Sequence, residues 1–557
     1  MNQNALTNTN SLWGHALAET LARLGVRHAV VSPGSRSTPI IWALTHCHGI
    51  ETIPLLDERG AAFFALGLAR QGGRPVVLAC TSGSAAANYL PAVVEAHESG
   101  APLLVLTADR PPELRRCAAG QAIDQTRMFG QYANEHFELP VPEPTMACLR
   151  QLRQTLSHAI RLTMLPARGP VHINCPLREP LAPEPGKTLT LDFDPYVLLK
   201  GVAPENFGYA LPDFDGIAPA GPGHCGLIVA GTQMADDDEA ARSSLWSLAV
   251  RSGYPVLCEA LGPWRAGEVP KGLIRVSAYG EILKDAAARE ALKPDFVLQV
   301  GPLPTSKALR QWLEALDTPT LICSTGHANL DPLHRRARQI CFAPELLHLL
   351  PLPAVKDGGY SALWAEAETQ ARAKLNAALD ETAMSEGGVA RELFRHLRAD
   401  CRLFVANSMS ARHAEQYAEC GHEPFRVHFS RGANGIDGTL ATALGMAHGG
   451  RGVLLTGDLA LLHDASSMMA ARQLRGHLSI VMVDNGGGGI FRHMPVADIP
   501  DRVFERYFLT PQNVDYVALC DAYGTDYQRI DSFVELRANL ANMPADGVRL
   551  LHVKVTG

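Results

Sequence analysis

The sequence has few of the features that mark secreted, membrane or nucleic-acid-binding proteins. None of its 12 cysteines forms a C-x-x-C pair, so we expect unpaired thiols in a reducing, cytoplasmic setting rather than a disulfide framework. No apolar run reaches the about 18 residues that cross a bilayer, and the start, MNQNALTNTN, is too polar for a secretory leader. A formal net charge of −7 gives no basic footprint for nucleic acid. No nucleic-acid or membrane partner is expected.

What the chain does have is enough apolar sequence for several domains. Its 557 residues are 46% hydrophobic, which suffices for three or four units, each with its own core. Stretches rich in Pro and Gly at 180–187, 202–224 and 350–359 divide the chain. The sequence therefore predicts three α/β domains with doubly wound parallel sheets, at 1–185, 186–355 and 356–557.

Strand–helix–strand patterns recur in all three ranges. The first range has apolar runs at 76–83 and 101–110 around a helical stretch at 85–100, and the last has runs at 452–458 and 478–485 around 464–476. The middle range repeats the pattern at 227–231, 241–253 and 254–260. Thr81 to Asp109 and Thr456 to Asp484 are the same distance apart in sequence, which indicates a weak internal duplication. Parallel sheets bind ligands beyond the carboxyl ends of their strands, so residues there are the candidates for function.

Oxygen-bearing residues follow two successive strands of the last range. Gly457-Asp458-Leu459 ends one strand, and Asp484-Asn485 followed by four glycines ends the next. A carboxylate and an amide oxygen at neighbouring strand ends suit Mg²⁺, which often shares its ligands with phosphate oxygens. Glycines there would let the backbone approach a diphosphate closely. Taken alone, the same residues could be an ordinary pair of turns.

This pattern resembles the metal-binding signature of thiamine-diphosphate enzymes. The resemblance implies thiamine diphosphate as cofactor, held through Mg²⁺ or Mn²⁺ by Asp458, Asn485 and the carbonyl of Gly487. Many members have Asn where this chain has Asp484, which leaves the role of Asp484 open. The first domain would then bind the cofactor's pyrimidine ring and the last its diphosphate. Further cofactor contacts are implied for Gly83, Ser408, Ile436, Gly457, Leu459, Ala460 and Ile490.

Glu58 matches the glutamate that thiamine enzymes use to activate the cofactor's pyrimidine ring. It stands just before an apolar helical stretch, in Leu56-Asp57-Glu58-Arg59-Gly60. The alternative is structural, with Asp57 capping the helix and Glu58 complementing its dipole. Ile436, within the glycine-rich run 432–438, matches the large apolar side chain over which the cofactor bends.

Longer motifs resemble one branch of the family, the carboligases of bacterial menaquinone biosynthesis. These are SPGSRSTP at 32–39, TADRPPEL at 107–114, QAI at 121–123, NSMSAR at 407–412 and SRGANGIDG at 430–438. The likeness spans nearly the whole chain and is weakest in the middle. It implies decarboxylation of 2-oxoglutarate and 1,4-addition of the resulting succinyl carbanion equivalent to isochorismate. Substrate contacts are implied for Ser35, Arg36, Arg110, Gln121, Lys307, Ser408, Arg412 and Arg431.

The arginines also have a physical reason to bind these substrates, because guanidinium groups hold carboxylates through two parallel hydrogen bonds. For any one of them a structural salt bridge is the alternative, and for Lys307 a solvated helix position. The basic residue that can follow this lysine in the family is replaced by Ala308, with Arg310 two positions on.

Ile490 and Phe491 would help to exclude water, or simply pack in a core. The cluster His46-Cys47-His48 has no second cluster to complete a zinc site.

Two other functions fit part of this pattern. A 2-oxo-acid decarboxylase or acetolactate-synthase-like carboligase would use the same cofactor, and a non-catalytic binding protein would keep the fold alone. The long motifs disfavour the first, and the presence of Glu58 and Asp458 disfavours the second. The resemblance further implies a homodimer or homotetramer, with each active site formed at a subunit interface.

Overall fold

The computed structural model describes residues 6–204, 225–232, 237–326, 328–355, 359–380 and 384–555. Most of the predicted break at 202–224, and residues 356–358 of the one at 350–359, lie outside these ranges. The chain divides into two compact units. Unit 1 comprises Met1–Phe207, Ser430–Gly449 and Leu462–Gly476, and unit 2 comprises Gly208–Phe429, Gly450–Leu461 and His477–Gly557.

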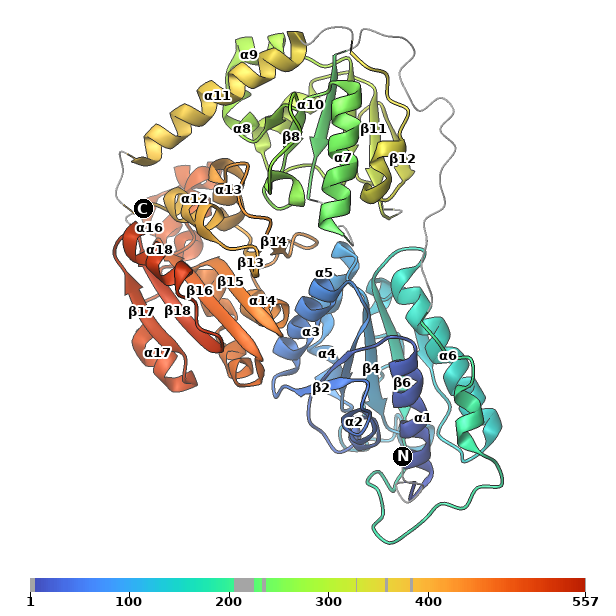
Figure 1. Cartoon of the computed structure of the whole chain (residues 1–557). Coiled ribbons are helices and arrows are strands. Elements are labelled where there is room, and N and C mark those ends of the chain that lie inside the picture. The colour runs from blue at the N-terminus through green and yellow to red at the C-terminus, as the bar shows by residue number, and fades with distance from the viewer. Residues whose placement is uncertain are drawn as a thin grey trace. The chain divides into compact units, whose positions relative to one another are not determined.

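Unit 1 contains a six-stranded parallel sheet in the order β2-β1-β3-β4-β6-β5 (Figure 1). Its strands are β1 (His28–Val31), β2 (Glu51–Pro54), β3 (Val76–Cys80), β4 (Leu103–Asp109), β5 (His136–Glu138) and β6 (Pro170–Pro176). Its helices are α1 (Thr9–Arg23), α2 (Thr38–Thr45), α3 (Glu58–Gly72), α4 (Ser84–Ala87), α5 (Leu90–Ser99), α6 (Met146–Met164) and α14 (Thr439–Ala447), with the 3₁₀ helix η7 (Ala465–Gln473). Apolar residues of α1, α2 and α6 form one core with the sheet.

Unit 2 contains two further six-stranded parallel sheets. The first, in the order β12-β11-β10-β7-β8-β9, comprises β7 (Gly226–Ala230), β8 (Val256–Cys258), β9 (Arg275–Val276), β10 (Phe296–Val300), β11 (Thr320–Ser324) and β12 (Ala337–Cys341). The second, in the order β14-β13-β15-β16-β18-β17, comprises β13 (Cys401–Val405), β14 (Arg426–Phe429), β15 (Gly450–Gly457), β16 (Gly476–Asp484), β17 (Asp526–Ile530) and β18 (Gly547–Lys554).

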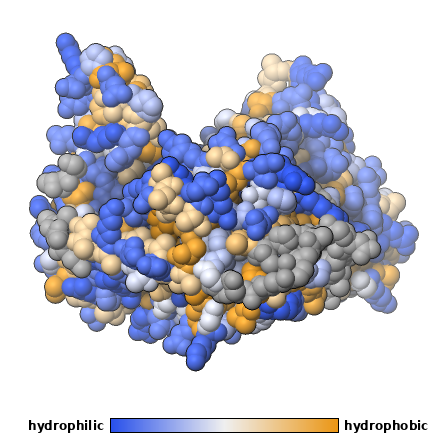
Figure 2. Space-filling model, turned by 90° about the horizontal axis from the view of Figure 1, so that it is seen from above, coloured by the Kyte–Doolittle hydropathy of each residue, from blue (hydrophilic) through white to orange (hydrophobic). Residues whose placement is uncertain are grey.

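The helices of unit 2 connect these strands. They are α7 (Asp238–Ser252), α8 (Tyr279–Ile282), α9 (Ala286–Ala291), α10 (Lys307–Glu314), α11 (Gly359–Asp380), α12 (Glu386–His396), α13 (Met409–Tyr417), α15 (Asp458–His463), α16 (Asp501–Phe504), α17 (Tyr516–Tyr523) and α18 (Phe533–Ala541). Separate apolar cores lie within the two sheet systems. Figure 2 shows a face on which hydrophilic residues surround smaller groups of apolar ones. No helix in the described ranges is both long and apolar enough to cross a membrane.

The three parallel sheets confirm the predicted fold class, and each sheet lies within one of the predicted ranges. The first and third sheets have the same strand order, as the predicted duplication requires, whereas the middle sheet has another. The exact boundaries at 185 and 355 stay a prediction.

Two predicted helices differ from the structure. The stretch 85–100 forms α4 and α5, because Pro91 lacks an amide proton and fits only the first turn of a helix. Within the stretch 464–476, Ala465–Gln473 form the 3₁₀ helix η7, whose Ser466 and Ser467 hydroxyls donate hydrogen bonds to aspartates.

Candidate active site

Unit 2 brings the three predicted metal ligands to the ends of two neighbouring strands. Asp458 begins α15 directly after β15, while Asn485 and Gly487 follow β16. Burial raises the pKa of Asp458 to about 6, although the amides of Leu459 and Gly487 donate hydrogen bonds that stabilise its charged form. Gly487 has a φ of 131°, and a Cβ there would lie 2.2 Å from the Leu509 carbonyl oxygen, so only glycine fits. A buried carboxylate with a raised pKa is a group that a bound cation would stabilise.

The environment of the Asn485 side-chain oxygen tests whether this site can bind a metal ion. Its Oδ1 is buried and has no hydrogen-bond partner in the described part of the chain. Its Nδ2 donates to Glu386 Oε1 at 2.9 Å, and His413 lies 3.1 Å from the other carboxylate oxygen of Glu386. A buried amide oxygen without a partner is costly unless something outside the chain binds it. One carboxylate, one amide oxygen and a backbone carbonyl fit Mg²⁺ or Mn²⁺.

Asp484, whose role the sequence left open, shapes the turn beside the predicted metal ligands. Its Oδ1 accepts a hydrogen bond from the Gly486 amide at 3.0 Å, and its Oδ2 pairs with His552 Nε2 at 3.0 Å. The bond to His552 lowers the pKa of Asp484. Asp484 is thus a structural anion. Gly457 ends β15, Leu459 and the buried Ala460 lie in α15, and half-buried Ile490 lies in the 3₁₀ helix η8 (Gly489–His493).

In unit 1, Glu58 is the first residue of α3 and is half-buried. Asp57 caps the helix by accepting the Arg59 amide at 3.0 Å, so the structural alternative is correct for Asp57. Glu58 lies in the first turn of α3, where its carboxylate also complements the helix dipole, so the structure is compatible with both roles of Glu58. Its charge contributes, after burial, to raising the pKa of Tyr89 and of Cys80 at the end of β3. An apolar hollow of about 360 Å³, lined among others by Pro33, Leu55 and Met469, adjoins this end of α3.

The glycine-rich loop with Arg431 and Ile436 is fixed in unit 1 by a glutamate that sequence reasoning missed. Glu95, buried on α5, accepts hydrogen bonds from the amides of Gly432 at 3.1 Å and Ala433 at 2.7 Å. Its own partner is the buried Arg70, 3.7 Å away. A single acid within the apolar stretch LPAVVEAH was the available signal. Arg431 and Ile436 are both half-buried.

Unit 1 also brings together several predicted substrate-binding residues at the ends of β1, β3 and β4. Arg110 Nη1 donates to Ser82 Oγ at 2.6 Å, and Gln121 Nε2 donates to the Ser82 carbonyl at 3.0 Å. Gly83 follows Ser82 and precedes α4. Arg36 is buried and donates to the Leu177 carbonyl at 2.9 Å. Burial and the nearby charge of Arg110 lower the pKa of Arg36. Ser35, its neighbour in the chain, is exposed.

Two guanidinium groups that approach each other at a partly buried site repel, and an anion between them removes that cost. Two carboxylates oppose this repulsion: the largely exposed Glu179, 3.4 Å from Arg36, and the buried Asp109. The pair Arg36 and Arg110 is a candidate carboxylate-binding site.

The remaining predicted contacts lie in unit 2. Ser408 precedes α13 with a φ of 66°, a conformation that non-glycine residues rarely adopt and that is enriched at functional sites. Arg412 donates to the Ser408 carbonyl at 2.8 Å, and partial desolvation and the charge of Arg310 lower its pKa. Lys307 is exposed at the start of α10. Arg310 donates hydrogen bonds to the carbonyls of Pro304 and Leu303, so it stabilises the loop that precedes α10.

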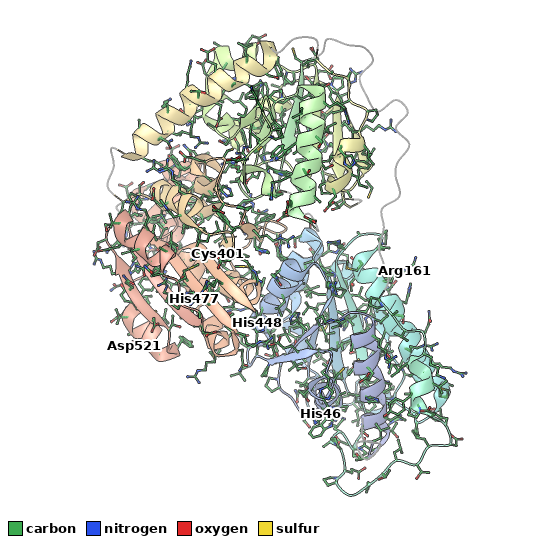
Figure 3. The ribbon with its side chains drawn as sticks, viewed as in Figure 1. His46, Arg161, Cys401, His448, His477 and Asp521 are labelled. Atoms are coloured by element: carbon green, nitrogen blue, oxygen red, sulfur yellow. The ribbon has the colours of Figure 1, made fainter. Side chains whose placement is uncertain are left out.

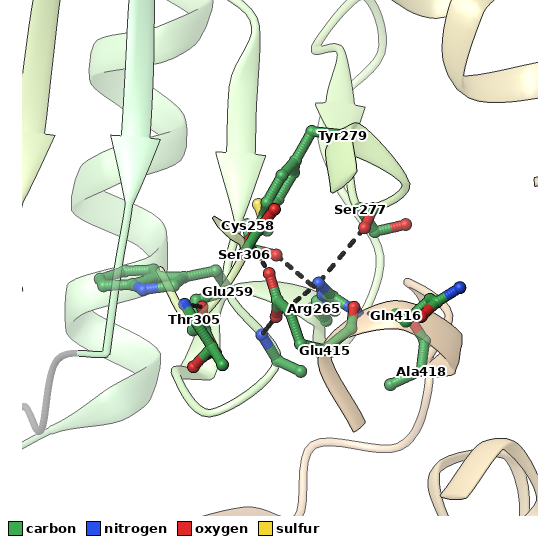
Figure 4. Close-up of polar contacts among 12 residues, drawn as sticks. Cys258, Glu259, Arg265, Ser277, Tyr279, Thr305, Ser306, Glu415, Gln416 and Ala418 are labelled. Carbon is green, nitrogen blue, oxygen red and sulfur yellow. Dashed lines mark hydrogen bonds and ion pairs between the residues drawn. The ribbon is translucent and has the colours of Figure 1, made fainter. Parts of the chain in front are cut away.

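A buried cluster of charged residues supports α13 and the loop that precedes α10 (Figure 4). Glu415 of α13 pairs with Arg265 at 2.9 Å and accepts the Ala260 amide at 2.8 Å. Glu259 accepts hydrogen bonds from the amide and hydroxyl of Thr305, two residues before Lys307. Burial and the charge of Glu259 raise the pKa of Glu415 well above its usual range. The cluster fixes α13 and the loop that precedes α10 against the same region of the middle sheet.

Two histidines outside these sites contact neighbouring side chains within unit 1. His46, labelled in Figure 3, stacks on Trp42 with ring centroids 4.3 Å apart, and the following Cys47 is buried. His448, also labelled, lies 3.0 Å from Glu51. Across the described ranges no group of three or more His, Cys, Asp or Glu side chains is arranged to hold a metal ion. The site at Asp458 has a different ligand set.

Two segments of the chain match family models of thiamine pyrophosphate enzymes. Residues 13–128 match the N-terminal TPP binding domain of thiamine pyrophosphate enzymes, and residues 408–553 match the C-terminal TPP binding domain. These two segments contain Glu58 and the three predicted metal ligands, respectively.

Curated relatives match over nearly the full chain. A 2-succinyl-5-enolpyruvyl-6-hydroxy-3-cyclohexene-1-carboxylate synthase from Microcystis aeruginosa is 43% identical over 556 residues, which cover 98% of this chain and 96% of the relative. Synthases of the same name from Gloeothece citriformis and Synechococcus elongatus are 42% and 44% identical, with 98% of this chain and 95% and 93% of the relatives covered. The chain therefore belongs to the thiamine pyrophosphate enzymes and, within them, to the family of 2-succinyl-5-enolpyruvyl-6-hydroxy-3-cyclohexene-1-carboxylate synthases.

Proposed function

We propose that this chain joins 2-oxoglutarate to isochorismate, with loss of CO₂, to give 2-succinyl-5-enolpyruvyl-6-hydroxy-3-cyclohexene-1-carboxylate for menaquinone biosynthesis. Near full-length similarity to synthases of that name supports the reaction. Within the structure, the observation that carries it is the placement of Arg36 and Arg110 beyond strand ends of the sheet that also positions Glu58, where the charge of Arg110 lowers the pKa of Arg36. The two substrates bring four carboxylates between them, which such a site can bind.

Thiamine diphosphate, when bound, supplies the electron sink that accepts the electron pair left by the departing CO₂. Asp458, Asn485 and the Gly487 carbonyl would hold the Mg²⁺ or Mn²⁺ that grips its diphosphate. The Glu58 carboxyl group would exchange a proton with the pyrimidine ring. Ile436 would support the bend between the cofactor's rings, and Gly83, Gly457, Leu459, Ala460 and Ile490 would line its site.

The substrate-binding residues have two tasks in this proposal. Arg36, Arg110, Arg412 and Arg431, with Ser35, Gln121, Lys307 and Ser408, bind the carboxylates and align the acceptor's conjugated alkene for 1,4-addition. Ile490 excludes water, because a proton from solvent would convert the succinyl unit to succinic semialdehyde before addition. Alignment of two bound substrates removes the entropic cost of their meeting during the reaction.

Assembly and domain roles belong to the same proposal. We assign pyrimidine-binding, central and diphosphate-binding roles to 1–185, 186–355 and 356–557. Glu58 lies in unit 1 and Asp458 in unit 2, and we propose that one cofactor contacts the Glu58 of one chain and the Asp458 of another. The functional form is then a homodimer or homotetramer. We further propose a cytoplasmic location, in keeping with cysteines that are all free in the described structure. If the protein sediments as a monomer and is fully active with cofactor, the proposal that two chains share each cofactor site is wrong.

The decisive assay combines purified protein with thiamine diphosphate, Mg²⁺, 2-oxoglutarate and isochorismate. Isochorismate absorbance and product mass are followed, and each component is omitted in turn as a control. We expect isochorismate loss that depends on 2-oxoglutarate and cofactor, with a product mass equal to both substrates minus CO₂. Succinic semialdehyde with isochorismate untouched would indicate a decarboxylase. No turnover under any condition would indicate a binding protein.

A further inference from the structure

A buried polar network lies directly behind the turn that holds Arg110 and Gln121. It is built on β4 and β6, which are neighbours in the first sheet (Figure 1). Its central residues, Asn174 and Gln125, are 0% and 1% exposed. Polar side chains in such a core are tolerated only when their hydrogen bonds are made. Every bond in this network therefore constrains its neighbours.

Two carboxylates fix the orientation of Asn174. Its Nδ2 donates to Asp109 Oδ2 and to Glu138 Oε2, both at 2.9 Å. Ionised carboxylates only accept hydrogen bonds, so the amide nitrogen must face them. The Asn174 oxygen is left to accept bonds from Thr107 Oγ1 at 2.8 Å and from Gln125 Nε2 at 3.0 Å.

The orientation of Gln125 follows from that of Asn174. Its Nε2 faces Asn174 Oδ1 and the Ala108 carbonyl, 3.2 Å away. Its Oε1 consequently points the other way and accepts the amide of Gly83 at 2.9 Å. Each group thus donates to the next, from the Gly83 amide through Gln125 and Asn174 to the two carboxylates.

Gly83 adopts a backbone conformation that needs such support. Its φ of 91° and ψ of −146° lie outside the regions open to other residues, and a Cβ would lie 2.9 Å from Gln121 Cγ. Ser82, just before it, receives the side chains of both Arg110 and Gln121. Gln125 therefore holds the turn against which two proposed substrate-binding side chains rest.

Arg115 contacts the same two carboxylates and fixes the backbone at Arg110 itself. Its Nη2 pairs with Asp109 at 2.8 Å and Glu138 at 2.6 Å, and its Nε donates to the Arg110 carbonyl at 3.1 Å. The Arg110 amide donates to Asp109 Oδ1 at 2.7 Å. Both backbone polar groups of Arg110 are thereby fixed by residues that lie behind it.

We propose that Gln125 and Arg115 are positioning residues for substrate binding by Arg110 and Gln121. Neither is assigned a contact with substrate or cofactor. Gln125 fixes the backbone at Gly83, and Arg115 fixes the backbone at Arg110. The inference rests on the proposed function, because it concerns how tightly the substrate carboxylates are held.

The test substitutes Gln125→Glu, which keeps an acceptor for the Gly83 amide but removes both donors and places a carboxylate against two acceptors. We expect the KM for 2-oxoglutarate or isochorismate to rise about tenfold or more, since buried acceptors lose their donors. The affinity for thiamine diphosphate, measured by fluorescence titration with Mg²⁺ present, should stay within about twofold. Gln131→Glu, the same change at an exposed position nearby, is the matched control.

Arg115→Gln is the second variant and decides the matter if Gln125→Glu does not fold, because Arg115 is partly exposed and easier to replace. It should also raise a substrate KM while cofactor affinity stays unchanged. Unaltered KM values in the folded variants would overturn the inference, as would losses of cofactor and substrate affinity in equal proportion. Wild-type enzyme runs in parallel: failure of wild type to consume isochorismate would instead overturn the proposed function, and the inference with it.

Discussion

The carboxylate of Glu386 accepts a hydrogen bond from the side-chain amide of Asn485 at 2.9 Å. Because a carboxylate attracts the amide nitrogen and repels the amide oxygen, this bond decides which end of Asn485 faces the proposed metal site. His413, 3.1 Å from the other oxygen of Glu386, holds the carboxylate in turn. The proposed metal ligand is therefore already oriented in the structure without a metal.

Replacement of Glu386 by alanine should weaken Mg²⁺ binding by about tenfold to a hundredfold, the usual effect of losing a residue that orients a metal ligand. Isothermal titration with Mg²⁺ at saturating thiamine diphosphate measures this directly. Glu423→Ala, at an exposed glutamate, should leave Mg²⁺ affinity unchanged. A Glu386→Ala protein with wild-type affinity would show that Asn485 needs no such support.

Glu58→Gln should bind thiamine diphosphate and Mg²⁺ almost as wild type does but lose about a hundredfold or more of kcat. The amide keeps the shape of the side chain yet cannot exchange a proton in the way that a carboxyl group does. Cofactor titration and steady-state kinetics on one preparation separate the two effects. Glu98→Gln, exposed in the same unit, serves as the control. Undiminished kcat would remove Glu58 from catalysis.

Helices α3 and α14 pack closely in unit 1, and Gly67 marks the contact. A Cβ at Gly67 would lie 2.1 Å from the Thr442 carbonyl oxygen, whereas a Cβ at Gly72 of the same helix meets nothing within 4 Å. Gly67→Ala should therefore destabilise the fold by about 1–3 kcal/mol, and Gly72→Ala should be neutral or slightly stabilising. Urea denaturation of both variants tests the difference, and equal midpoints would contradict the close packing.

Acidification should destabilise the protein partly through His172. Burial, together with the nearby His136, lowers the pKa of His172 from 6.5 to about 3. Below pH 6.5 the unfolded chain gains a proton here that the folded chain does not, so stability falls as pH drops from about 6.5 towards 3, by at most about 1.4 kcal/mol per pH unit. His172→Gln should show a shallower decline in melting temperature between pH 7 and pH 5. Exposed His48→Gln is the control, and an unchanged slope in His172→Gln would contradict the assignment.

The sequence predicted those parts of the structure that depend on local pattern. Apolar runs at 76–83 and 452–458 identified strands β3 and β15, and the spacing from Asp458 to Asn485 indicated ligands at neighbouring strand ends. The break between α4 and α5 was missed although Pro91 was visible, because the apolar periodicity continues through it.

Long-range contacts could not be predicted in this way. Glu386 reaches Asn485, and Gln125 reaches Gly83, only because the sheets bring distant segments together. Nothing near Glu386 or Gln125 in the sequence distinguishes them from surface residues. The backbone strain at Ser408 and Gln121, each with a positive φ, likewise depends on tertiary contacts that no local pattern reveals.

The shared strand order of the first and third sheets gives two of these residues corresponding positions. Arg110 directly follows the aspartate that ends β4, and Asn485 directly follows the aspartate that ends β16. The shared strand order thus presents opposite polarity at the same point: a guanidinium suited to anions in the first sheet, and an amide oxygen suited to a cation in the third. Under the proposed function, corresponding strand ends therefore bind ligands of opposite charge.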